Sequence, residues 1–279
     1  MPGDQVEKTY AERQKYLIEL RRLMKEDDLL RNLQSDDGYL QRFLYCTDFD
    51  VEEALKRLKT FYELLEECPG WFTRGSPEDK RSIIEKDIRI VPNEYDKEGR
   101  IIYIAKIGNM EYGTMDLVED VVSVDDFFAE ALSEDLSLFK NGVCILIDVA
   151  NFSWKLMKWL NPFSIKMILK RATTMPIKDY RFHVINNNFL VKAAINFIWP
   201  FLPKYIKDRV YFHFNDYDSL YQHVDKESLP VEYGGKKDTD YSKYHCILYE
   251  RSSQIVESFE VNRTRFLENL AKNKVEKTT

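Results

Sequence analysis

The feature that most limits the possible folds is an apolar segment at residues 189–202. Eleven of its fourteen residues are apolar, in a chain of which 32% is charged. A helix with 3.6 residues per turn would give this segment two apolar faces. One face contains Leu190, Ala194, Phe197 and Phe201, and the other contains Val191, Ile195, Ile198 and Leu202. A surface helix normally has a single apolar face, so this helix requires two apolar partners.

Two interpretations of this segment are open. The segment is too short to span a bilayer, and Pro200 and Pro203 interrupt it. It fits a helix that is buried in a protein core. It also fits a lid, with one face on a hydrophobic ligand and the other face on a membrane.

Length and charge limit the class of protein. A chain of 279 residues predicts one or two domains. A net charge of −6 argues against a nucleic-acid partner. No secretory signal is visible, and no run approaches the roughly 20 apolar residues of a membrane span. We therefore expect a cytoplasmic protein.

The secondary-structure pattern divides the chain into three regions. Residues 1–87 have the spacing of helices, one of which begins with Asp50 as its cap. Residues 88–236 alternate strand-like and helix-like runs, which predicts an α/β fold with a mostly parallel sheet. The run at residues 143–149 is almost continuously apolar, as in a strand covered on both faces. Residues 237–279 predict a charged helical tail.

The sequence favours binding over catalysis. No hydrolase elbow, phosphate loop, zinc-protease motif or dinucleotide turn is present. The cysteines and histidines are too scattered for a metal or redox motif, so we expect no metal and no cofactor. Asp148 is the one acid in an apolar strand. It fits either a buried base or, as we favour, a cap that accepts hydrogen bonds from the following backbone.

Four motifs together resemble the CRAL-TRIO family of lipid-binding proteins. They are DGYLQRFL with FDVEEA at residues 37–54, ILID at 145–148, VIN at 184–186 followed by the apolar segment, and LPVEYGG at 229–235. Their order and spacing resemble the branch that contains α-tocopherol transfer protein and cellular retinaldehyde-binding protein. The resemblance covers roughly residues 30 to 236.

The resemblance implies a helical amino-terminal module followed by a bowl with a sheet as its floor and helices as its walls. One hydrophobic molecule would lie inside, and the helix after Asn186 would be a mobile lid. The implied ligand-binding residues are Phe127, Phe128, Ala131, Val143, Ile145, Ile147, Phe152, Trp154, Ile165, Ile168, Leu169, Phe189, Ala193 and Phe197. The lid residues are Phe189, Leu190, Ala194, Phe197, Ile198, Phe201 and Leu202. Phe197 is expected to face inward, so that a charge there would abolish ligand loading.

The same branch has a basic cleft that receives phosphoinositide headgroups. By alignment, the implied phosphoinositide-binding residues here are Lys56, Lys178 and Arg209, with Lys204 and Lys207 as neighbours. Three expected basic residues are replaced by Thr47, Tyr180 and Tyr205. The sequence therefore retains only part of the branch's basic pattern.

Two further positions depart from the family. Asn188 stands where the family often has proline. Ile177, after Pro176, stands where the phosphatidylinositol-exchanging branch has a glutamate that pairs with a lysine near the headgroup. A buried headgroup would lack that partner, so a weakly polar lipid is favoured over a phospholipid.

Two functional hypotheses follow. The leading one is a carrier, without a reaction, that moves one tocopherol-, retinoid- or carotenoid-like molecule between membranes, with phosphoinositide as a trigger. It would be peripheral on membranes during transfer. The alternative is a phosphoinositide- or phospholipid-sensing signalling adaptor of the same fold, in which the charged tail would matter most. An enzyme that hydrolyses lipid is a third and weaker reading.

Overall fold

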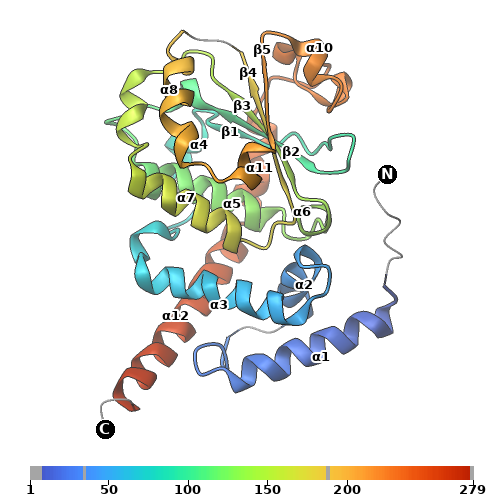
Figure 1. Cartoon of the computed structure of the whole chain (residues 1–279), viewed down its shortest axis with the longest axis vertical. Coiled ribbons are helices and arrows are strands. Elements are labelled where there is room, and N and C mark those ends of the chain that lie inside the picture. The colour runs from blue at the N-terminus through green and yellow to red at the C-terminus, as the bar shows by residue number, and fades with distance from the viewer. Residues whose placement is uncertain (1–7, 34–35, 187–188, 277–279) are drawn as a thin grey trace.

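A five-stranded sheet forms the centre of the structure, a computed structural model that describes residues 8–33, 36–186 and 189–276 (Figure 1). The strands, in spatial order, are β1 (Arg89–Ile90), β2 (Ile101–Lys106), β3 (Val143–Asp148), β4 (Tyr180–Ile185) and β5 (Val210–Phe214). β1 is antiparallel to β2, and the other pairs are parallel. The predicted α/β fold with a mostly parallel sheet is confirmed.

The helices surround this sheet and extend below it (Figure 1). They are α1 (Tyr10–Glu26), α2 (Asp37–Cys46), α3 (Val51–Glu67), α4 (Arg81–Ile84), α5 (Ser123–Ala131), α6 (Ser137–Lys140), α7 (Pro162–Thr174), α8 (Val191–Ile198), α9 (Lys204–Lys207), α10 (Tyr217–Leu220), α11 (Ser242–Glu250) and α12 (Ser252–Glu276). Asp50 caps α3 as expected, because its side chain accepts a hydrogen bond from the Glu53 backbone N–H at 3.0 Å. In the described part of the chain, no helix has both the length and the hydropathy needed to cross a membrane.

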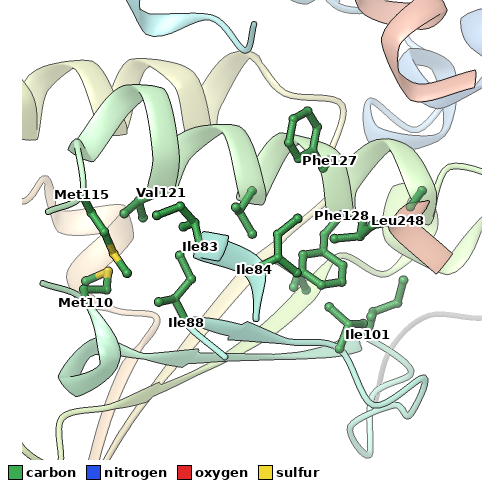
Figure 2. Packing of buried hydrophobic residues seen from close by; sticks show 14 of the residues in the cluster. Ile83, Ile84, Ile88, Ile101, Met110, Met115, Val121, Phe127, Phe128 and Leu248 are labelled. Carbon is green, nitrogen blue, oxygen red and sulfur yellow. The ribbon is translucent and has the colours of Figure 1, made fainter. Parts of the chain in front are cut away.

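Both faces of the sheet are covered by apolar side chains. On one face, α5 packs Phe127 and Phe128 over the β1–β2 side, together with Ile83, Ile84 and Ile101 (Figure 2). On the opposite face, Cys144 and Leu146 of β3 lie in a second cluster that includes residues from α10 and the segment after it. Coverage on both faces explains why the β3 sequence is an almost unbroken apolar run.

The carboxyl-terminal helix joins the two ends of the chain. Phe266 of α12 is fully buried in a cluster formed by α1, α2 and α3, and its ring stacks on Tyr62 at 5.3 Å between centroids. Asn269 donates to the Leu29 carbonyl at 3.0 Å and accepts from Asn32 at 3.1 Å. The three-region division stays a prediction, but its first and last regions share one hydrophobic core.

This arrangement predicts that an alanine substitution at Phe266 of α12 strongly destabilises the protein, whereas one at the neighbouring Leu267 has almost no effect. Phe266→Ala should reduce the free energy of unfolding by about 3–5 kcal/mol, because it leaves a cavity among α1, α2 and α3. Leu267→Ala is the matched control: its side chain is exposed, so its effect should stay within about 0.5 kcal/mol. Urea denaturation measures both. Equal effects would show that α12 does not pack on the amino-terminal helices as described.

Candidate ligand-binding cavity and lid

An apolar cavity of about 370 Å³ lies between the sheet and α8. Its floor is made by Ile147, Val184 and Phe212, which are neighbours in register across β3, β4 and β5. The 22 lining residues are Ile107, Met110, Leu117, Ile147, Val149, Phe152, Leu156, Trp159, Leu160, Ile168, Leu169, Phe182, Val184, Val191, Ala194, Ile195, Ile198, Trp199, Leu202, Ile206, Val210 and Phe212. A concave site of this size and composition suits a small hydrophobic molecule.

α8 covers this cavity with one face and exposes aromatic side chains on the other. Val191, Ala194, Ile195 and Ile198 line the cavity. Phe197 and the following Phe201 are each 44% exposed, with ring centroids 5.9 Å apart, and Phe189 is 87% exposed. We call Phe189, Phe197 and Phe201 the outer aromatic face. A helix with such an outer face is not a buried core helix, so the first of the two open interpretations is excluded.

A buried hydrogen-bond network fixes the carboxyl ends of the central strands. The Asp148 carboxylate accepts from the Ala150 N–H at 2.9 Å, from the Asn186 amide at 2.6 Å and from the Tyr233 hydroxyl at 2.8 Å. The Tyr217 hydroxyl donates to the Asn186 amide oxygen. Asp148 is therefore a cap, as favoured from the sequence.

This network holds the point at which β4 ends and the chain turns toward α8. Asn186 has a φ of 61°, a left-handed conformation that asparagine tolerates better than most residues, and its N–H donates to the Phe214 carbonyl at 2.7 Å. Burial, together with the Asp148 charge, holds the pKa of Tyr233 far above its usual range, so its hydroxyl remains a donor. A Cβ on Gly235 would lie 1.9 Å from the Leu229 carbonyl oxygen, so the last glycine of the fourth motif is required there.

Comparison with known proteins now decides the family. The family model described as the CRAL/TRIO domain matches residues 85–235, more than half of the chain. This chain belongs to the CRAL-TRIO family. It is thus a member of a family of lipid-binding and lipid-transfer proteins that associate with membranes.

Two similar CRAL-TRIO relatives are Clavesin-1 of Xenopus laevis and Clavesin-2 of Homo sapiens. The chain is 27% identical to the first over 207 residues, which cover 73% of this chain and 62% of that protein. It is 28% identical to the second, with 73% and 63% covered. The chain therefore spans less than two thirds of the length of these relatives. Among solved structures, the crystal structure of Sfh5 aligns with 95% of this chain and 97% of that one, at 12% identity and a TM-score of 0.46.

The structure places four of the fourteen expected CRAL-TRIO ligand-binding residues on the cavity wall. They are Ile147, Phe152, Ile168 and Leu169. Val210 and Phe212 of β5 also line the cavity, and the sequence argument missed them. Their alternation along the strand is the signal that could have identified them, because residues two apart face the same side of a sheet. Trp159, Trp199 and Ile206 also line the cavity. They lie in or next to short turns and helices, in which too few residues repeat for the sequence to indicate which side chains face inward.

Six of the expected residues do not line the cavity and are buried or half-buried elsewhere. Phe127 and Phe128 of α5 are buried over the β1–β2 half of the sheet (Figure 2), and Ala131 is buried in the same cluster. The cavity instead lies over β3, β4 and β5. The other three are Val143, Ile145 and Ile165. The sequence identified these residues as inward-facing but could not tell which half of the sheet each would cover.

The remaining four expected lining residues point outward. Trp154, Phe189, Ala193 and Phe197 are all exposed. The expectation that Phe197 faces inward is wrong, and Ala194 lies on the inner face instead. Helical periodicity placed Ala194 on one face with Phe197, whereas the structure places it with Val191, Ile195 and Ile198 on the cavity side, because the boundary between the two faces depends on how α8 packs on the sheet.

The five expected phosphoinositide-binding residues mostly contact acidic side chains of this chain. Lys56 pairs with Glu53 at 3.1 Å, Lys178 with Asp48, Lys204 with Asp208 at 2.6 Å, and Arg209 with Asp179 at 2.7 Å. The Lys207 ammonium lies 5.7 Å from the Trp199 ring centroid. Headgroup recognition at these residues stays a prediction.

Two of the substituted positions, Thr47 and Tyr180, are half-buried and contact other groups of this chain. The Thr47 hydroxyl donates to the Phe43 carbonyl at 2.9 Å, and Tyr180 stacks on Phe182. Tyr205 is exposed. The first two side chains therefore have structural contacts that account for their residue types without a headgroup.

The strands on either side of α8 in sequence carry a cluster of histidines. His183 of β4 and His213 of β5 stack at 5.1 Å, and their ring nitrogens lie 2.9 Å apart. The His223 ring lies 5.0 Å from that of His183. Burial, with smaller contributions from the other two histidines, lowers the pKa of His183 from 6.5 to about 3. Mainly through burial, the pKa of His213 is lowered too. No three His, Cys, Asp or Glu side chains in the described ranges are arranged to hold a metal ion.

These lowered pKa values predict that mild acid destabilises the protein. Below about pH 6.5 the unfolded chain binds protons at His183 and His213, while the folded protein binds them only at lower pH, near pH 3 for His183. The free energy of unfolding should therefore decrease as the pH is lowered, by up to about 1.4 kcal/mol per pH unit for each histidine. Chemical denaturation between about pH 7 and pH 5 measures this slope. His183→Phe should flatten the slope; an unchanged slope would contradict the assignment.

Proposed function

We propose that this protein carries one small hydrophobic molecule, tocopherol-, retinoid- or carotenoid-like, between membranes without a chemical reaction. The observation that supports it is an almost wholly apolar cavity covered by α8, together with the exposed aromatic side chains Phe189, Phe197 and Phe201 on the outer side of the α8 segment. Exposed aromatic clusters of this kind mark sites of protein or membrane interaction. The cavity supplies the ligand site, and the outer aromatic face supplies the membrane contact.

The two faces of α8 give a physical reason for transfer without exposure to water. Each CH₂ group of the ligand that leaves water contributes about 0.8 kcal/mol, so a ligand in the cavity dissociates into water very slowly. When the outer aromatic face enters a bilayer, burial of Phe189, Phe197 and Phe201 offsets contacts that α8 loses at the cavity. The ligand can then move directly between the cavity and the acyl chains.

Phosphoinositide headgroups are proposed as the trigger for this movement. Lys204 and Lys207 lie in α9, the next α-helix after α8, and Lys178 and Arg209 precede β4 and β5, the strands on either side of α8 in sequence. A phosphate would have to replace the carboxylates of Asp48, Asp179 and Asp208 as their partner. Replacement of these carboxylates by phosphate before and after α8 in the sequence would favour displacement of α8 from the cavity.

Deletion of the charged tail cannot test the adaptor alternative. Deletion of the charged tail would remove Phe266 from the core shared with α1, α2 and α3, so loss of activity would report unfolding. No observation in the structure favours the adaptor over the carrier.

Mass spectrometry of the purified protein tests the proposal directly. Under native conditions we expect one bound hydrophobic compound per chain, which lipid extraction of the same sample then identifies. A stoichiometric phospholipid would instead indicate membrane-lipid exchange. If the protein is empty and takes up none of a panel of tocopherol, retinol and β-carotene from vesicles, the carrier proposal is wrong.

The two faces of α8 should separate loading from transfer. Ile195→Asp places a charge in the apolar cavity without a partner, so ligand occupancy should be lost. Phe197→Asp alters only the outer aromatic face; occupancy should persist, while transfer to acceptor vesicles slows by about tenfold or more. Fluorescence transfer assays and extraction measure the two quantities.

Ile18→Asp on α1 is the matched control, since Ile18 is an exposed aliphatic side chain at the opposite end of the molecule from α8 (Figure 1). It should change neither loading nor transfer. Loss of occupancy in Phe197→Asp with normal folding would show that this side chain faces the ligand after all.

A further inference from the structure

The cavity wall contains almost no group that can hydrogen-bond to a ligand. None of its 22 lining residues is charged, and none carries a hydroxyl, an amide or an imidazole. The polar side-chain groups among them are the indole N–H groups of Trp159 and Trp199, with the weakly accepting sulfur of Met110. The wall that faces the cavity is nevertheless apolar almost throughout.

Most of the nearby polar groups are paired elsewhere. The backbone groups of Ile147 and Val184 are paired within the sheet, because β3 and β4 each lie between two other strands, whereas Phe212 lies on the edge strand β5. Asp148, Asn186 and Tyr233 bond to one another at the strand ends, and none of the three lines the cavity. A ligand hydroxyl inside the cavity would therefore give up its hydrogen bonds to water or to lipid headgroups and find almost no replacement on the wall.

The cost of such an unpaired group is large enough to select among ligands. Burying a hydroxyl without a partner in a protein interior weakens binding by about tenfold to a hundredfold. A hydrocarbon of the same length bears no such cost and gains the same apolar contacts.

We infer that the part of the ligand that occupies this cavity is pure hydrocarbon, such as a polyisoprenoid or carotenoid chain, and carries no hydroxyl, carbonyl or ester. The inference rests on the proposed carrier function and narrows its ligand class. By this inference the cavity differs in ligand preference from sites that bind a lipid alcohol or aldehyde through a hydrogen bond inside the pocket. Val184, at the centre of the floor, sets this selectivity together with Ile147 and Phe212.

A matched pair of probes tests the inference. The protein is incubated with phosphatidylcholine vesicles that contain equal amounts of pentadecane and of the pentadecanol with its hydroxyl on the central carbon. That hydroxyl must lie inside the cavity whichever end of the chain enters first. Extraction and gas chromatography of the separated protein should show the alkane enriched over the alcohol by about tenfold or more, relative to the vesicles.

Val184→Thr supplies the missing hydrogen-bonding group on the cavity floor. Threonine is close to valine in shape and favours strands, so β4 should be retained. The added hydroxyl should shift the bound ratio toward the alcohol by about tenfold. Val143→Thr is the matched control: Val143 is equally buried, on β3, but does not line the cavity, so it should leave the ratio unchanged.

The outcomes distinguish this inference from the carrier proposal. If the wild type binds alkane and alcohol equally, or prefers the alcohol, the hydrocarbon inference is wrong while the carrier proposal stands. If neither compound nor any other vesicle lipid is bound, the carrier proposal fails and the inference fails with it.

Discussion

The buried carboxylate of Asp148 is the constraint on which the functional part of this structure depends. It joins the end of β3, the end of β4 at Asn186 and the loop that holds Tyr233, three segments separated by dozens of residues. An unpaired charge in this position would be strongly unfavourable, so the three hydrogen bonds must form together. Because they do, the chain leaves β4 in a fixed direction, and α8 lies over the β4–β5 half of the sheet.

A second dependence links the ends of the chain. α12 supplies Phe266 and Asn269 to the core and the hydrogen bonds of the amino-terminal helices, while Arg251, just before it, donates to the Ala131 carbonyl at the end of α5. The amino-terminal helices are thereby attached to the α/β part through the carboxyl-terminal helix as well as through their own covalent connection. The charged tail is a structural component of the protein and not a free appendage.

The sheet itself is divided between two tasks. Over β1 and β2, Phe127 and Phe128 of α5 are fully buried among apolar side chains, and these contacts hold the fold together (Figure 2). Over β4 and β5, α8 leaves an apolar space of about 370 Å³ and exposes its other face. The same sheet face thus carries close packing in one half and the proposed ligand cavity in the other, so residues of similar type have different surroundings in the two halves.

The sequence alone determined the features that repeat locally. Strand and helix periodicity predicted the α/β fold, the unbroken apolar β3 and an α8 with apolar residues on two sides, because each depends on the phase of side chains along one element. The sequence favoured a cap at Asp148 but left a buried base open, and the hydrogen bonds of the structure decided between them. Only the tertiary structure decided that Phe197 faces outward, that Phe127 and Phe128 lie in closed packing while Phe212 lines the cavity, and that Phe266 meets Tyr62. These outcomes depend on how elements far apart in sequence are offset and rotated against one another, and a pattern within one element does not contain that information.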